Sequence, residues 1–97
     1  MAKQIIWSRK AQNELLEILE YWVNRNKSNT FSLKLNFLID EQLKLILEFP
    51  KIGRKTDIDN VYIKVIYKYL LYYEFQNGDL HILTIRHGSK NPDTLKI

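Results

Sequence analysis

The chain has 97 residues, of which 45% are hydrophobic, and this is enough apolar material for one domain, residues 1–97, with one core. It contains no cysteine, which excludes disulfides and thiolate metal sites and fits a reducing cytoplasm. The net charge of +4 favours polyanionic partners, namely nucleic acid, a ribosome or an acidic protein.

The first residues predict a short strand that leads into a helix. Residues 3–7 contain a strand-length apolar run and lack the longer apolar stretch of a signal peptide. The Ser8 hydroxyl can accept from first-turn amides, and apolar residues then recur with helical spacing from Ala11 to Val23. The polar residues 24–29 end this helix. No segment approaches transmembrane length, so we expect a cytoplasmic protein without a membrane partner.

A second helix is predicted for residues 30–49. Pro50 stops it, because the proline ring disfavours a helical conformation in the preceding residue. The short link between the two helices implies an antiparallel helical hairpin. The main apolar stripe consists of Phe31, Leu35, Leu38, Ile39, Leu43 and Ile46. Leu33, Phe37 and Leu47 widen this stripe, so we expect the helix to present apolar surface to two sides.

Beyond Pro50 the sequence pattern changes from helical spacing to that of strands and turns. Residues 50–60 read as a loop, residues 61–67 alternate, and residues 69–75 are dense in strand-forming types. Asn77-Gly78 supplies the positive φ angles of a type I′ hairpin turn, and residues 80–86 form the last strand.

These elements predict the order β-α-α-β-β-β. Two helices can cover one face of an antiparallel sheet, which gives an α+β fold whose other sheet face is open.

The side chains of common catalytic and cofactor sites are missing from this sequence. There is no conventional nucleophile–base–acid set, no metal-ligand spacing and no glycine-rich phosphate loop, so we expect no metal and no cofactor. His81 and His87 lie six positions apart on one strand and cannot form a compact metal site by themselves.

Basic and aromatic residues remain, and they could bind RNA or cleave it without a metal. The basic group consists of Lys51, Arg54, Lys55, Lys64, Lys68, Arg86, His87 and Lys90, with Tyr62, Tyr67, Tyr69, Tyr72 and Tyr73 among them. Several of these residues also have a structural explanation. The tyrosines can pack the sheet, Arg54 can pin the loop, and His87 can be a solvated residue at the end of a strand. Lys64 interrupts an apolar run, so we expect it to point to the open sheet face.

The order of elements together with three stretches of sequence resembles the RelE/ParE toxin superfamily of bacterial type II toxin–antitoxin systems. The stretches are FPKIGRK (residues 49–55), VYIKVIYKYLLYYEF (residues 61–75) and ILTIRHGSKNP (residues 82–92). The resemblance covers nearly the whole chain and implies a small cytoplasmic toxin that a cognate antitoxin neutralises.

Two activities are known in this superfamily. RelE-like members are metal-independent, ribosome-dependent mRNA endoribonucleases, whereas ParE-like members block DNA gyrase. The loop and the ending look more like the ParE side, so the resemblance favours gyrase inhibition, with the nuclease as the alternative. A non-toxic basic module that binds a protein through its open sheet is the competing class.

The resemblance also assigns residues. If the protein is a nuclease, the catalytic residues would be His87, Arg86 and Lys64. Lys64 stands where many members have arginine, and it would lose the bidentate phosphate contact. Contact with the target or the antitoxin would fall to Arg54, Lys64, Arg86 and Lys90, of which Lys90 replaces a commoner arginine.

Overall fold

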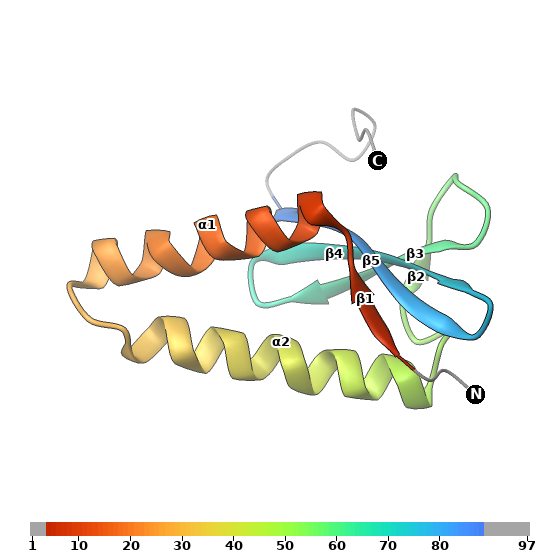
Figure 1. The fold of residues 1–97 in the computed structure, drawn as a ribbon, viewed down its shortest axis with the longest axis horizontal. Helices are drawn as coiled ribbons and strands as arrows, with labels where there is room; N and C mark the ends of the chain where they lie inside the picture. The colour runs from red at the N-terminus through yellow and green to blue at the C-terminus, as the bar shows by residue number, and fades with distance from the viewer. Residues whose placement is uncertain (1–3, 89–97) are drawn as a thin grey trace.

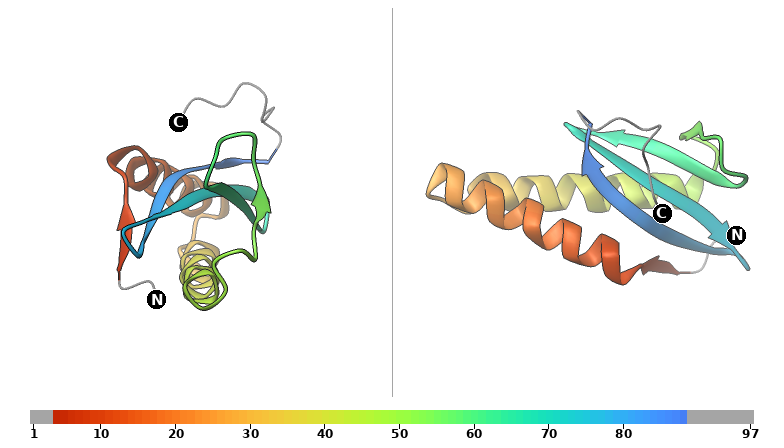
Figure 2. Two further views of the ribbon diagram at one scale, coloured as in Figure 1. Left: turned by 90° about the vertical axis from the view of Figure 1, so that its right-hand side faces the viewer. Right: turned by 90° about the horizontal axis from the view of Figure 1, so that it is seen from above.

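The computed structural model describes residues 4–88, and its elements follow the expected order with one added strand (Figure 1). They are β1 (Ile5–Trp7), α1 (Arg9–Asn26), α2 (Thr30–Glu48), β2 (Arg54–Lys55), β3 (Val61–Ile66), β4 (Tyr69–Gln76) and β5 (Asp79–His87). Both helices lie on one side of the sheet, which confirms the α+β fold with a helical hairpin on one face (Figure 2).

The sheet has five strands in the order β1-β5-β4-β3-β2. All pairs are antiparallel except β1 with β5, where Ile5 pairs with Leu80 in parallel. The expected sheet was antiparallel throughout, and the expected loop at residues 50–60 had no strand. Tight hairpins impose the antiparallel direction, but β1 reaches its neighbour through the whole helical hairpin and three other strands, so no turn fixes its direction.

Local signals at the ends of the helices act as the sequence predicts. The Ser8 Oγ accepts from the Ala11 N–H at 3.0 Å and caps α1. The same hydroxyl donates to the Leu83 carbonyl oxygen at 3.0 Å and ties the start of α1 to β5. Asn77 and Gly78 have φ angles of 53° and 83°, as the β4–β5 turn requires.

The main core lies between the hairpin and the sheet. It contains the buried residues Ala11, Leu35, Ile39, Leu43, Ile46, Ile66, Tyr69, Leu71, Tyr73, Leu80, Ile82 and Ile85. A second cluster lies on the sheet face away from the helices, which we call the far face; it consists of Val61, Ile63 and Tyr72, with Leu70 and Leu83 packed against them. Both faces of β3 therefore carry apolar side chains.

Helix α2 also presents apolar side chains outside the core. Leu33 is 62% exposed and Phe37 is 66% exposed, which confirms the expected second apolar side of this helix. A groove of about 300 Å³ runs beside them, with Trp7 and Leu15 on its opposite wall. Patches of this kind mark interaction surfaces more often than the scattered apolar residues of a monomer do.

Candidate functional site

The strand register places Lys64 on the face that the helices cover. Lys64 pairs with Leu71, which is fully buried in the main core, and paired residues share a face. The expectation that Lys64 points to the open face is therefore wrong. The error arises because the apolar alternation of Val61 and Ile63 serves the far face, while Tyr62 and Ile66 pack toward the helices.

Arg54 and Arg86 both lie on the far face, on strands β2 and β5, which β3 and β4 separate. Arg54 pairs with Ile63, and Arg86 pairs with Leu70, and both partners belong to the far-face cluster. Neither arginine forms an ion pair with another residue of the described range 4–88. Of the four residues expected to bind the target or the antitoxin, Lys64 lies on the opposite face and Lys90 lies outside the described residues.

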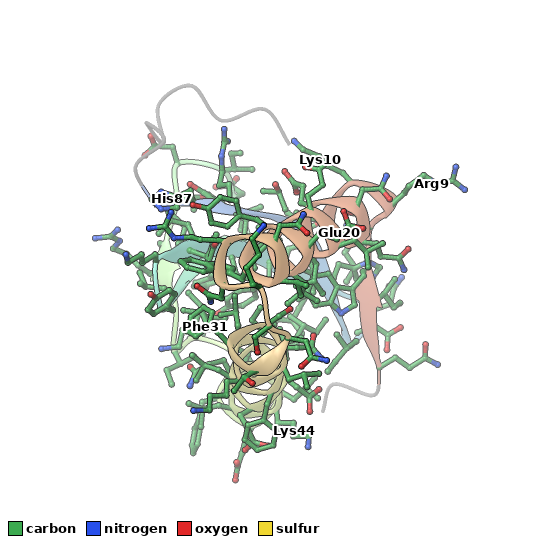
Figure 3. The ribbon with its side chains drawn as sticks, turned by 90° about the vertical axis from the view of Figure 1, so that its left-hand side faces the viewer. Arg9, Lys10, Glu20, Phe31, Lys44 and His87 are labelled. Atoms are coloured by element: carbon green, nitrogen blue, oxygen red, sulfur yellow. The ribbon has the colours of Figure 1, made fainter. Side chains whose placement is uncertain are left out.

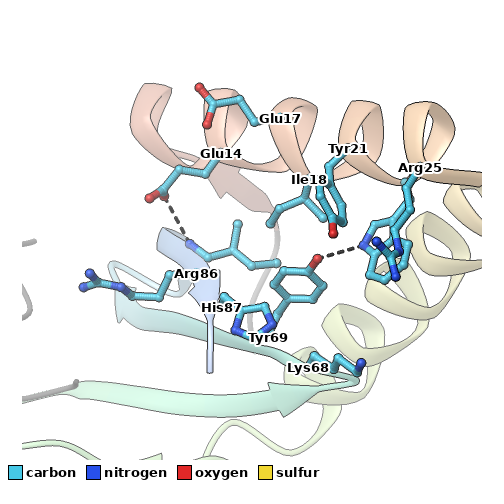
Figure 4. A pocket seen from close by; sticks show the side chains of 11 residues that line it. Glu14, Glu17, Ile18, Tyr21, Arg25, Lys68, Tyr69, Arg86 and His87 are labelled. Atoms are coloured by element: carbon cyan, nitrogen blue, oxygen red, sulfur yellow. Dashed lines mark hydrogen bonds between the residues drawn. The ribbon is translucent and has the colours of Figure 1, made fainter. Parts of the chain in front are cut away.

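His87 lies on the helix-covered face, at the end of β5. Its ring meets the Tyr69 ring edge-on, with 5.7 Å between the centroids. The Arg86 guanidinium points away from it (Figure 4). The buried residues Tyr69 and Leu71 lie on the strand between His87 and Lys64. The structure therefore does not bring His87, Arg86 and Lys64 to a single point around one phosphate.

A cavity of about 440 Å³ opens between α1 and the end of β5 (Figure 4). We call it the α1–β5 pocket; it is lined by Glu14, Glu17, Ile18, Tyr21, Trp22, Arg25, Lys68, Tyr69, Ile85, Arg86 and His87. None of the α1 residues of this wall was expected to have a functional role. Their spacing of three or four positions from Glu14 to Arg25 places them on one helix face, and this signal was available in the sequence.

Aromatic side chains hold one wall of the α1–β5 pocket in place. The Trp22 indole N–H donates to the Tyr69 hydroxyl at 2.8 Å and links α1 to β4. The Trp22 ring also meets the rings of Tyr21 and Phe31 edge-on, at centroid distances of 5.1 and 4.7 Å. Figure 3 shows this end of the molecule. Phe31 lies below α1, and His87 lies to one side of α1. Tyr69 therefore packs within the protein, which agrees with the alternative prediction that the tyrosines serve as sheet packing.

Glu14 accepts hydrogen bonds from the edge of β5 in the part of that strand that β1 does not pair with. Its carboxylate oxygen accepts from the Thr84 hydroxyl at 2.6 Å and from the Ile85 N–H at 3.2 Å. Thr84 is fully buried. Because β1 ends at Trp7, this carboxylate and the Ser8 hydroxyl satisfy backbone groups that a longer first strand would have bonded.

Replacing Glu14 by alanine is expected to lower the free energy of unfolding by about 1–3 kcal/mol, because it leaves a buried hydroxyl and a strand N–H without an acceptor. Glu14→Gln keeps an oxygen acceptor and should recover part of the loss. Urea unfolding measures the effect. Glu17→Ala, on an exposed residue of the same helix, is the control and should change stability by less than about 0.5 kcal/mol. Equal losses in the two alanine variants would contradict this role.

The loop between α2 and β2 is fixed by Tyr73 rather than by Arg54. The Tyr73 hydroxyl donates to the Pro50 carbonyl oxygen and accepts from the Gly53 N–H, both at 3.0 Å. Burial raises the pKa of Tyr73 above its usual value, against the opposing effect of the Gly53 hydrogen bond. Arg54 is exposed, so the alternative in which it pins the loop is wrong.

Among residues 4–88, no group of three or more histidine or acidic side chains is arranged to hold a metal ion. Neither of the described helices is long and apolar enough to span a membrane. The structure gathers aromatic, basic and acidic side chains around the α1–β5 pocket, and it places Arg54 and Arg86 on two separate strands of the far face.

Residues 5–92 match the family model described as the ParE toxin of the type II toxin–antitoxin system parDE. The chain belongs to the ParE toxin family. Its fold is similar to that of a solved chain from the chromosomal ParDE toxin–antitoxin system of P. aeruginosa, with a TM-score of 0.74 and 22% identity. The similarity covers 90% of this chain and 96% of that one. No curated protein matches the sequence.

Membership of the ParE family makes the protein the toxin component of a type II toxin–antitoxin system with an antitoxin as partner. It confirms the resemblance to the RelE/ParE superfamily and favours the ParE side over the RelE side. The competing interpretation as a non-toxic binding module is not supported, because the family match spans nearly the whole chain.

Proposed function

We propose that the protein inhibits DNA gyrase in the cytoplasm, and that its cognate antitoxin neutralises it. The observation that carries this proposal is the ParE family match over residues 5–92. The positions of His87, Arg86 and Lys64 also support inhibition over mRNA cleavage, since three side chains that are divided between two sheet faces cannot jointly stabilise one scissile phosphate.

The antitoxin would cover the exposed apolar side of α2. Leu33 and Phe37 lie beside a groove that Trp7 and Leu15 complete, and an amphipathic helix can bury such a groove. Gyrase would meet the far face, where Arg54 and Arg86 flank apolar side chains and can pair with carboxylates.

Expression of the protein alone is expected to arrest bacterial growth, and co-expression of the antitoxin gene beside its own should restore it. The purified protein should inhibit supercoiling by gyrase in the absence of ribosomes, and the purified antitoxin should relieve the inhibition. Ribosome-bound mRNA incubated with the toxin should stay intact. Normal growth at high soluble expression would contradict the toxin function. Arrest with mRNA cleavage and unaffected supercoiling would instead contradict gyrase as the target.

A further inference from the structure

The charges around the α1–β5 pocket are divided between its two ends. Glu14 and Glu17 lie in the first half of α1, and Arg25 lies in its last turn. At the rise of about 1.5 Å per helical residue, roughly 16 Å separates Glu14 from Arg25 along the helix axis. Lys68 lines the pocket from the β3–β4 turn. This turn lies at the Arg25 end, because the neighbouring Tyr67 and Tyr69 both contact Trp22.

Between these ends the pocket floor is apolar. Ile18 and Trp22 line it from α1, while Tyr69 and Ile85 line it from the sheet. Tyr21 is 52% exposed at the rim, so its ring is accessible to a bound group. A volume of about 440 Å³ lies within the range of ordinary ligand pockets, roughly 300–1,000 Å³, and accommodates one or two side chains of a partner.

The cations at one end are available for a new contact. Neither Arg25 nor Lys68 forms an ion pair within the described part of the chain, and Lys68 lies 5.5 Å from the centroid of the Tyr67 ring. The acidic end disfavours a nucleic-acid strand, because Glu17 and the engaged carboxylate of Glu14 would face a continuous row of phosphates. A peptide can place a single carboxylate at the basic end alone.

We propose that the α1–β5 pocket binds an apolar side chain of the antitoxin together with a neighbouring carboxylate, which pairs with Arg25 and Lys68. This surface is separate from the α2 groove, and Arg86 is the one residue named here that it shares with the far face. It relies on the antitoxin partner of the proposed function and not on gyrase as the target. Aromatic residues and arginine are the residue types that most often dominate binding energy at protein interfaces, and the pocket offers both.

The test is the affinity of the purified full-length toxin for the purified antitoxin encoded beside it, measured by titration calorimetry without gyrase. We expect Arg25→Gln combined with Lys68→Gln to weaken binding at least about 10-fold, and Tyr21→Ala to weaken it by roughly 30-fold, in the range of interface hot spots. Raising the salt concentration should weaken the wild type more than the double variant, because the lost contact is electrostatic.

Control variants make comparable changes elsewhere. Leu16→Ala truncates an exposed apolar side chain on α1 that does not line the pocket, and Arg9→Gln removes an exposed charge at the start of α1. Both should bind like the wild type. The altered side chains are all exposed, and unfolding curves establish that each variant is folded before its affinity is compared.

Wild-type affinity in both the double variant and Tyr21→Ala would overturn the proposal. So would reduced gyrase inhibition with unchanged antitoxin affinity, since it would assign the pocket to the target. Displacement of the antitoxin by a single-stranded RNA oligomer, lost in the double variant, would assign it to nucleic acid and would likewise overturn the proposal. Failure of gyrase inhibition in the wild type would remove gyrase as the target and leave the measured antitoxin affinities standing.

Discussion

Removing the charges of Arg54 and Arg86 together is expected to abolish growth arrest, whereas His87→Gln is expected to leave it in place. The two arginines share the far face and have no ion-pair partner among residues 4–88, so a carboxylate-bearing target can engage both. A loss of about 2 kcal/mol at each arginine, typical of an interface hot spot, weakens binding by roughly 30-fold per residue. Colony counts after induction and the dose of toxin that halves supercoiling measure the effect.

The control for this experiment is a toxin that loses two positive charges elsewhere. Arg9→Gln with Lys34→Gln keeps the net charge equal to that of the arginine variant and alters exposed helical positions away from the far face. It should arrest growth like the wild type. A ribosome-dependent mRNA cut that disappears in His87→Gln would contradict the expected pattern, because general acid–base catalysis contributes about a hundred- to ten-thousand-fold to such reactions.

Gly53→Ala is expected to cause one of the largest losses of stability that a single methyl group can produce in this chain. A Cβ atom at Gly53 would lie 2.6 Å from the Tyr73 hydroxyl oxygen and 2.7 Å from the Ile63 carbonyl oxygen. Overpacking of this kind costs about 1–3 kcal/mol. For a domain of this size a loss of 2 kcal/mol corresponds to a fall in Tm of roughly 8–16 °C. Thermal and urea unfolding measure it.

Two companion variants identify the source of the loss. Tyr73→Phe removes one of the two clashing atoms but leaves the Gly53 N–H and the Pro50 carbonyl without their partner. Gly53→Ala should therefore cost less in the Tyr73→Phe background than in the wild type, which a double-mutant cycle detects. Gly88→Ala is the control, since its Cβ would approach the Lys68 carbonyl oxygen no closer than 3.2 Å. Equal losses at Gly53 and Gly88 would contradict the steric account.

The sequence predicts well those features that a few neighbouring residues determine. Ser8 caps α1, Pro50 follows the end of α2, and Asn77-Gly78 forms the hairpin turn, because each depends on backbone conformation within one turn of chain. The face of Lys64 was predicted wrongly, because β3 packs apolar residues on both sides and alternation alone does not say which side the helices cover.

Features that join distant segments could not be read from the sequence. Tyr73 lies 20 positions from Gly53, and no sequence pattern in either segment predicts the hydrogen bond between them. Glu14 reads as a solvated helical residue until β5 is placed beside α1. The α1–β5 pocket also forms only because β5 lies beside α1. The sequence shows that the α1 residues of the pocket share one helix face, but it does not show that this face lines a pocket. Of the residues that line this pocket, the sequence singled out Lys68, Tyr69, Arg86 and His87, and it did not indicate that they lie beside α1.

The parallel pairing of β1 with β5 affects how the toxin folds during its synthesis. Ser8 meets Leu83 across 75 positions, and β5 also separates β1 from the rest of the sheet. While a ribosome is still making the chain, β1 has no strand to join, and the core lacks Leu80, Ile82 and Ile85 until β5 has emerged. Contacts this far apart in sequence form late and slowly. A chain cut short before β5 therefore cannot complete the toxin fold, and the surface that an antitoxin has to cover forms only after β5 has been made.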